Sequence, residues 1–205
     1  ILEIENRQIG SDNPPFVIAE IGNNHNGSLS VAKELIDAAT EAGADCVKFQ
    51  YRDMDSLYRK TDSDEQANDL GVEYTLDLLA RFQLSQKDIY EAFDYARAKG
   101  VIVMCTPWNM EAFRTLEDYG LPAYKIASAD LTNLPLLKTI AKSGKPMLLS
   151  TGMSHEWELK NTISVLESVD AEYALLHCNS TYPTPFKDVN LAYLARLSDL
   201  HDGVV

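Results

Sequence analysis

Polar side chains stand at the ends of six short apolar segments of the sequence. In chain order they are Glu20, Lys48, Gln50, Thr106, Lys125, Ser128, Asp130, Ser150, Thr151, His177, Ser180 and Tyr182. Lysine amines and hydroxyl groups are suited to hold phosphate and carboxylate, and a carboxylate such as Glu20 can act as a general base or orient a water. Structural accidents would not be confined to one end of each segment, so the pattern predicts a binding site for an anionic small molecule.

The two lysines and the glutamate each have a competing interpretation. Lys48 and Lys125 are flanked by apolar residues, and lysine is rarely buried without a partner. Either amine could extend to solvent or pair with a carboxylate such as Glu20. A Schiff base on one lysine is the competing chemistry. By the same reasoning, Glu20 is either a counter-ion or a catalytic group.

The four histidines do not specify a metal site by their spacing. His25, with Asn24, either satisfies backbone groups in the polar stretch GNNHNG or belongs to the site. We expect His155 and His201 to be solvated and His177 to be hydrogen-bonded in the core. No HxxxH or carboxylate–histidine spacing is present, so no metal ligand is assigned within the 205 residues.

The apolar segments predict strands, and the stretches between them predict helices. The strands are FVIAEI, DCVKFQ, VIVMCTP, AYKIAS, PMLLST and YALLHC. Apolar stripes at helical spacing run through Val31, Leu35, Ala38 and Ala42, through Ile89, Phe93 and Ala96, through Leu159, Ile163 and Leu166, and through Leu191, Leu194 and Leu197. Ser85 and Ser154 are the expected N-caps of two of these helices.

Alternating strands and helices predict parallel βα units, and strands that are apolar throughout predict cover on both faces. We therefore expect an α/β fold, a (β/α)8 TIM barrel truncated after about six units, with LHDGVV opening another strand. A doubly wound sheet is the alternative, but EIGNNHNG is not the glycine-rich phosphate loop that it would more often carry. In a barrel, the polar strand ends converge where catalytic groups lie.

We expect residues 1–205 to form a single partial barrel domain. Residues 1–15 alternate and then reach turn residues from Gly10 to Pro15, which predicts a short N-terminal hairpin. Residues 58–74 lack an apolar stripe and are expected to form a long loop between a strand and a helix.

Composition excludes some classes of partner. Apolar residues make up 45% of the chain and charged residues 24%, as in ordinary globular proteins. A net charge of −13 argues against nucleic acid or an anionic membrane as partner. Cys46, Cys105 and Cys178 lack CxxC spacing and are expected to be buried and reduced. Without a signal peptide or an apolar run of transmembrane length, a cytoplasmic location is expected.

Six motifs together resemble the sialic acid synthase family, which includes N-acetylneuraminate, legionaminate and pseudaminate synthases. They are FVIAEIGNNHNG, ADCVKFQ, CTPW, YKIASADLTNLPLL, LLSTGMS and LLHCNSTYPTP, in the family's order from Phe16 to Pro185. The resemblance implies a metal-assisted condensation of phosphoenolpyruvate with the open-chain aldehyde of a 2-acetamido sugar. The products would be a nine-carbon 2-keto acid and phosphate.

The resemblance also implies roles for individual residues. The positions that would hold phosphoenolpyruvate are Lys48, Thr106, Lys125, Ser128 and Ser150. Gln50, Asp130 and Tyr182 would face the sugar, Glu20 would be placed for catalysis, and Asp130 is assigned with it to the catalytic residues. Asp130 stands where many members have Glu, and Ser180, assigned to substrate binding, stands where some have Asn, so the sugar acceptor is open.

The family's metal-binding histidines would lie beyond residue 205, so Mn²⁺ or Mg²⁺ is the expected cofactor, with its protein ligands outside this chain. A small C-terminal domain that reaches the partner's site in a homodimer is also implied there. We therefore expect the chain to be a fragment of a longer protein, without synthase activity alone. The alternatives are another phosphoenolpyruvate-dependent keto-sugar-acid synthase, a Schiff-base aldolase using Lys125, and a non-catalytic barrel fragment.

Overall fold

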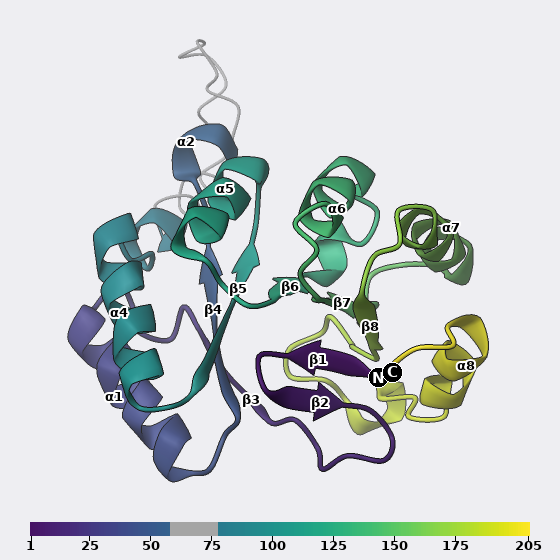
Figure 1. Cartoon of the computed structure of the whole chain (residues 1–205), viewed down its shortest axis with the longest axis horizontal. Helices are drawn as coiled ribbons and strands as arrows, with labels where there is room; N and C mark the ends of the chain where they lie inside the picture. Colours follow the sequence, from purple (N-terminus) through teal and green to yellow (C-terminus); the bar gives the residue numbers. More distant parts are fainter. Residues whose placement is uncertain (58–77) are drawn as a thin grey trace. The chain divides into compact units, whose positions relative to one another are not determined.

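The computed structural model describes residues 1–57 and 78–205 (Figure 1). These residues form two compact units, one of residues Val17–Gly120 and one of Ile1–Phe16 together with Leu121–Val205. The loop expected over residues 58–74 lies outside the described residues. The assignment of the whole chain to one domain stays a prediction.

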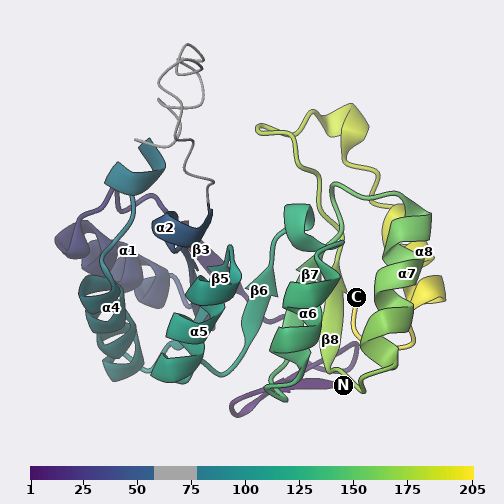
Figure 2. The ribbon, with the colours of Figure 1, turned by 90° about the horizontal axis from the view of Figure 1, so that it is seen from above.

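In the unit Val17–Gly120, three strands pair in parallel, in chain order. They are β3 (Ile18–Gly22), β4 (Cys46–Tyr51) and β5 (Ile102–Pro107). The helices are α1 (Leu29–Glu41), α2 (Met54–Leu57), α4 (Gln86–Ala98) and α5 (Met110–Tyr119). The pair α1 and α4 lies side by side along this sheet (Figures 1 and 2).

In the other unit, strands β6 (Tyr124–Ile126), β7 (Met147–Ser150) and β8 (Tyr173–Leu176) also pair in parallel. The helices are α6 (Leu134–Ala141), α7 (Glu156–Glu167) and α8 (Tyr193–Leu200), with short 3-10 turns η1 (Ser128–Asp130) and η2 (Phe186–Asp188). Val204 forms a parallel bridge to Ala174 of β8, so the segment predicted to open another strand does pair with the sheet. All six predicted strands are confirmed.

The predicted N-terminal hairpin is confirmed, and its two strands are joined by a turn of their own. Strands β1 (Leu2–Ile4) and β2 (Arg7–Ile9) pair antiparallel around a turn at Glu5 and Asn6. Glu5 adopts a φ of 51°, a left-handed conformation that is uncommon for a residue other than glycine. The turn expected from Gly10 onward is also present, after β2, where the Asn13 N–H donates to the Gly10 carbonyl at 3.1 Å. The turn within the hairpin, at Glu5, is the one that the sequence pattern did not predict.

Helix α4 follows the sequence closely. The Ser85 side chain accepts a hydrogen bond from the Asp88 N–H, as an N-cap does. Ile89, Phe93 and Ala96 are buried, as their spacing predicts.

Other helices correct the sequence analysis in detail. Helix α1 buries Ala32 and Ile36 rather than the stripe through Val31 and Leu35. Helix α7 begins after His155, which with Glu158 forms a capping box, rather than after Ser154. In α8 only Leu197 of the expected stripe is buried.

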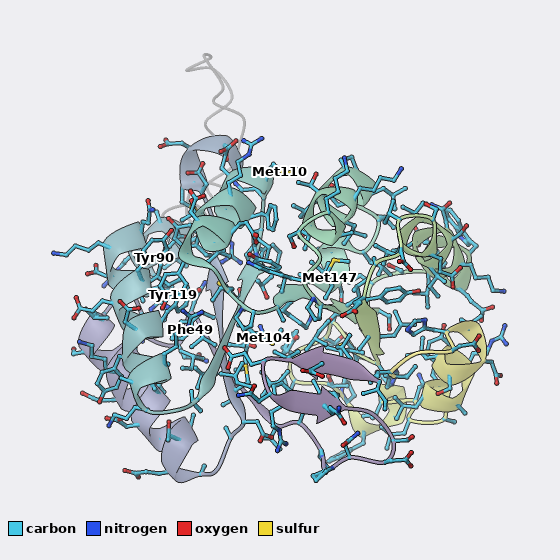
Figure 3. The ribbon with its side chains drawn as sticks, viewed as in Figure 1. Phe49, Tyr90, Met104, Met110, Tyr119 and Met147 are labelled. Atoms are coloured by element: carbon cyan, nitrogen blue, oxygen red, sulfur yellow. The ribbon has the colours of Figure 1, made fainter. Side chains whose placement is uncertain are left out.

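The two faces of β4 have different environments. Phe49 packs edge to face on Phe93 of α4, with ring centroids 5.5 Å apart, and Tyr119 contacts Phe93 in turn. Figure 3 shows Phe49 and Tyr119 on the helix side of the sheet. Because side chains alternate along a strand, Lys48 and Gln50 lie on the opposite face. The aromatic layer therefore fixes which side chains of β4 are presented away from the helices.

Candidate active site

The first polar group lies at the carboxyl ends of β3, β4 and β5. Its predicted members are Glu20, Lys48, Gln50 and Thr106, and the sheet register pairs Glu20 with Lys48 and Gln50 with Thr106. The Lys48 side chain is nearly buried, forms an ion pair with Glu20 Oε2, and donates from Nζ to Thr106 Oγ1 at 3.4 Å. The structure thus brings these four predicted residues together, and Lys48 does have the carboxylate partner that its burial requires.

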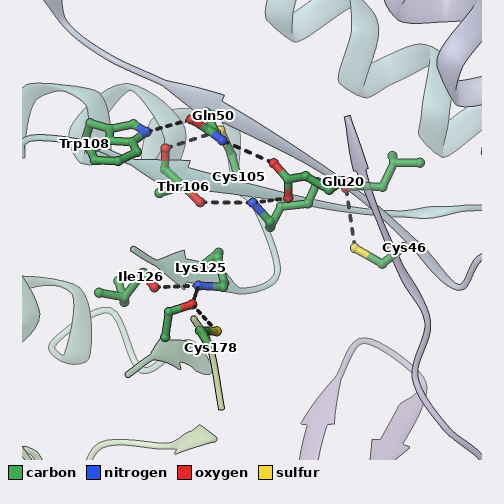
Figure 4. A network of polar contacts seen from close by, with 12 residues as sticks. Glu20, Cys46, Gln50, Cys105, Thr106, Trp108, Lys125, Ile126 and Cys178 are labelled. Atoms are coloured by element: carbon green, nitrogen blue, oxygen red, sulfur yellow. Dashed lines mark hydrogen bonds and ion pairs between the residues drawn. The ribbon is translucent and has the colours of Figure 1, made fainter. Parts of the chain in front are cut away.

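Gln50 connects the carboxylate to two residues that the sequence analysis did not assign to the site. Its Nε2 donates to Glu20 Oε1 at 3.3 Å. Its Oε1 accepts from Arg52 Nη2 and from Trp108 Nε1, each at 3.2 Å. Figure 4 shows the Gln50 amide between Trp108 and Glu20. The sequence did contain a signal for Arg52. It lies two residues after Gln50, and side chains two residues apart point to the same side of an extended chain.

The structure explains why a glycine, Gly22, stands two residues after Glu20. Its φ is 52°, and a Cβ placed there would lie 2.8 Å from Glu20 Oε1 and 3.3 Å from Gln50 Nε2. A side chain at this position would both strain the backbone and displace the carboxylate. Gly22 therefore leaves the room in which the Glu20–Gln50 contact forms.

A Gly22→Ala substitution is expected to lower the activity of the protein by about tenfold or more and to cost about 1–2 kcal/mol of unfolding free energy from the left-handed backbone alone. Gly43→Ala is the matched control, because Gly43 also has a left-handed φ but nothing within 4 Å of its Cβ position. Thermal unfolding and turnover of both variants separate the two effects. Equal losses of activity in the two variants would show that the carboxylate contact does not matter.

His25 has a structural role in this unit. It is buried, and its Nδ1 accepts a hydrogen bond from the Gly27 N–H at 3.1 Å. Burial lowers the pKa of His25, with a smaller opposing effect from a hydrogen bond to the Gly22 backbone. The first of the two interpretations of His25, satisfaction of loop backbone, is thus the one that the structure supports.

The second polar group lies at the ends of β6, β7 and β8. Lys125 is 9% exposed, and its Nζ donates to the Ile126 carbonyl at 2.6 Å and to Ser150 Oγ. Cys178 Sγ lies 3.1 Å from the same Ser150 oxygen (Figure 4). Of the three cysteines only Cys178 is incompletely buried, and sequence reasoning had treated all three as core residues.

Ser128 and Asp130 lie on η1, directly after β6. Ser128 Oγ accepts a hydrogen bond from the Gly152 N–H at 3.1 Å. Asp130 accepts from Asn133 Nδ2 at 3.1 Å. Burial raises the pKa of Asp130, and the Asn133 hydrogen bond opposes that shift in part. A carboxylate held at a cost in this way is typical of functional sites.

Asp130→Asn is expected to raise the melting temperature at pH 7, by about 2–4 °C for each kcal/mol that the amide gains in a chain of this size. A pKa raised by folding means that the folded state holds the proton more tightly. The corresponding stability is present below the unfolded pKa of about 3.9 and is lost as pH rises through the folded value. The advantage of the amide should therefore shrink as pH falls toward about 4. Calorimetry across this range checks it, and a gain that does not depend on pH would contradict it.

Of the remaining predicted residues, Thr151, His177 and Ser180 line a pocket beside β8, and Tyr182 does not. The pocket has a volume of about 680 Å³, and Thr151, Cys178 and Ser180 are among its lining residues. Ser180 Oγ would lie 2.9 Å from a Cβ at Gly152. Tyr182, expected to face a sugar, is 91% exposed and does not line the pocket. His177 follows β8, and its Nε2 lies 2.6 Å from the Val189 carbonyl.

Residues 1–57 and 78–205 contain no group of three or more His, Cys, Asp and Glu side chains that could hold a metal ion. The described residues therefore do not fit a complete metal site. Within the same ranges, no helix has the length and apolar character needed to cross a bilayer.

Several known proteins are similar to this chain in sequence and fold. The model of the NeuB family matches residues 35–205. The N,N'-diacetyllegionaminic acid synthase of Campylobacter jejuni is 38% identical over 90% of this chain and 57% of its own length. The human N-acetylneuraminate-9-phosphate synthase is 31% identical over 99% of this chain and 58% of its own length.

Among solved structures, the N-acetylneuraminic acid synthetase of Leptospira borgpetersenii, crystallised with citrate, superposes with a TM-score of 0.86. It is 29% identical and covers 98% of this chain, which covers 66% of it. This likeness confirms the predicted fold class, a (β/α)8 barrel, and the described residues contain six strand–helix units of it. The chain spans little more than half the length of the curated relatives named above. Since the family model matches most of its residues, the chain belongs to the NeuB family.

Proposed function

We propose that the protein carrying this chain condenses phosphoenolpyruvate with the open-chain aldehyde of a 2-acetamido sugar. In this reaction C3 of phosphoenolpyruvate bonds to the aldehyde carbon, a water oxygen adds to C2, and the C2–O bond to phosphate breaks. The products are a nine-carbon 2-keto acid and inorganic phosphate. The observation that carries the proposal is the nearly buried Lys125 amine on the Ser150 hydroxyl at the strand ends.

The second polar group is suited to an anion. A buried ammonium beside hydroxyl groups binds phosphate or carboxylate through charge-assisted hydrogen bonds. Ser150 Oγ contacts the Lys125 amine and the Cys178 thiol. If both donate to its two lone pairs, the serine O–H is left to donate to a ligand oxygen. We assign Lys125, Ser128 and Ser150 to phosphoenolpyruvate on this basis.

The first polar group supplies a carboxylate and further donors. Lys48 and Thr106 are proposed to contact phosphoenolpyruvate, and Gln50 the sugar. Glu20 is proposed to accept the proton of the attacking water, since its carboxylate is partly exposed while Lys48 and Gln50 hold its two oxygens in place. General-base catalysis of this kind contributes about 10²–10⁴-fold in rate.

The proposal extends to groups beyond this chain. A divalent cation, Mn²⁺ or Mg²⁺, would polarise the sugar aldehyde, with protein ligands from residues outside positions 1–205. Asp130, Ser180 and Tyr182 are proposed to contact the sugar acceptor, and the complete protein is proposed to be a homodimer in the cytoplasm.

The decisive experiment measures phosphate release by the complete protein with phosphoenolpyruvate, Mn²⁺ and a panel of 2-acetamido sugars, with a control lacking sugar. Release that depends on one sugar supports the proposal and identifies the acceptor. Release with a shorter aldose and with none of the acetamido sugars would indicate another keto-sugar-acid synthase. A folded protein that releases no phosphate with any sugar would overturn the proposal and favour a non-catalytic barrel.

A further inference from the structure

The side-chain amide of Gln50 has only one orientation that satisfies its neighbours. Two N–H donors, from Arg52 and Trp108, meet Oε1, and a carboxylate oxygen of Glu20 meets Nε2. The reversed amide would place its N–H groups against two donors and its oxygen against a carboxylate. Each buried polar group left unmatched costs about 1–3 kcal/mol, so the contacts fix the orientation.

The two donors are themselves held in place. Arg52 is 7% exposed, and its guanidinium lies 4.3 Å above the Trp108 ring. Gln83 accepts from the Arg52 N–H at 3.2 Å and donates to the Arg52 carbonyl. A guanidinium that stacks on a ring, on a backbone held at both its N–H and its carbonyl, loses little conformational freedom when it donates. Arg52 and Trp108 thus form a preorganised clamp on Gln50.

We infer that Arg52 and Trp108 are positioning residues that restrict Gln50 to hydrogen-bond donation toward its substrate. An amide oxygen has two lone pairs, and both are taken by the clamp; the amide nitrogen has two hydrogens, and one is taken by Glu20. The second hydrogen of the partly exposed Gln50 is the group offered to a ligand. Gln50 therefore selects an oxygen acceptor, which on the proposed function is a carbonyl or hydroxyl oxygen of the sugar.

The first test measures hydrogen exchange of the Trp108 indole N–H and does not depend on enzymatic turnover. In ¹H–¹⁵N spectra of the complete protein, Trp108→Phe assigns the Trp108 indole N–H, and Trp157→Phe assigns that of Trp157, which is 69% exposed. The Trp108 proton should exchange with water more slowly, and Gln50→Ala should speed its exchange about tenfold, as expected for the loss of about 1.4 kcal/mol. Exchange of Trp108 that is as fast as that of Trp157, or unchanged by Gln50→Ala, would overturn the clamp.

The second test uses kinetics with matched controls. Trp108→Phe keeps the aromatic ring but loses the donor, and Arg52→Met keeps much of the apolar stem. Each should raise KM for the sugar about 3- to 10-fold with KM for phosphoenolpyruvate unchanged within about twofold. The controls are Trp157→Phe and Arg97→Met, since Arg97 also stacks on an aromatic ring, Tyr119, at 4.7 Å.

The outcomes separate the inference from the proposed function. Equal rises in KM for the sugar and KM for phosphoenolpyruvate, or the same rise in the control variants, would show that Arg52 and Trp108 only contribute to packing. Either result would overturn the positioning role. If the unaltered protein releases no phosphate with any sugar, the proposed function fails, and the indole exchange alone decides whether Arg52 and Trp108 hold Gln50.

Discussion

A Lys125→Met variant is expected to bind phosphoenolpyruvate about 100-fold more weakly while staying folded. Methionine fills much of the space of the lysine stem, but it removes the positive charge and the N–H group from which Ser150 Oγ accepts a hydrogen bond. Hydrogen bonds to charged groups contribute about 1.5–3 kcal/mol each, so the loss of one or two of them corresponds to about 100-fold. Calorimetric titration with phosphoenolpyruvate measures the affinity, and phosphate release should fall in parallel.

Lys145→Met is the matched control for this prediction. Lys145 belongs to the same unit but precedes β7, at the opposite end of the strand from Ser150. Wild-type affinity in Lys125→Met, or an equal loss in the control, would contradict the role of Lys125 in anion binding. Borohydride treatment with pyruvate should leave the mass of the wild-type protein unchanged, because the proposed reaction forms no imine on Lys125.

The strands and the polar residues at their ends could be predicted from the sequence because one physical rule governs both. Parallel strands covered on both faces are apolar throughout, so a segment such as MLLS of β7 is recognisable without its neighbours. Polar side chains appear only where such a segment ends, because there the strand is no longer covered on both faces. Glu20, Lys48, Gln50 and Thr106 could therefore be assigned to one edge of a sheet before any contact was known.

Helix α1 shows where the sequence pattern is ambiguous. The neighbours Val31 and Ala32, and likewise Leu35 and Ile36, are all apolar, so two stripes one residue apart fit the same helical period. Only packing against β3 and α4 selects Ala32 and Ile36 for burial. The turn inside the N-terminal hairpin could not be predicted for a related reason, since Glu5 adopts a backbone conformation that sequence rules reserve mainly for glycine.

The clamp on Gln50 could not be predicted because it depends on contacts between distant residues. Trp108 is 58 positions from Gln50 in the sequence, and only the register of β4 with β5 places its indole beside the amide. The requirement for glycine at position 22 could not be predicted either, because it comes from the nearby Glu20 carboxylate as well as from the backbone conformation. Such residues are recognised from the space around a functional group rather than from their type.

A Glu20→Gln variant is expected to lose about 10²–10⁴-fold in kcat, the range for removal of a general base. The amide has nearly the same shape, but it cannot accept the proton of the attacking water. It should bind phosphoenolpyruvate at least as tightly as the wild type, because Lys48 no longer has a carboxylate partner in Glu20 and can turn its full charge toward the ligand. Steady-state kinetics and calorimetric titration together measure this separation.

Glu91→Gln is the matched control, since Glu91 also forms an ion pair with a lysine, Lys33 at 2.7 Å, but on the helices of the same unit. This variant should change neither kcat nor affinity. The two interpretations of Glu20 predict different values of kcat in the test variant. A counter-ion that only neutralises Lys48 would leave kcat nearly intact in Glu20→Gln, whatever the effect on affinity. A large loss of kcat with retained affinity assigns Glu20 to the chemical step, because only an interaction that strengthens in the transition state lowers kcat without weakening binding.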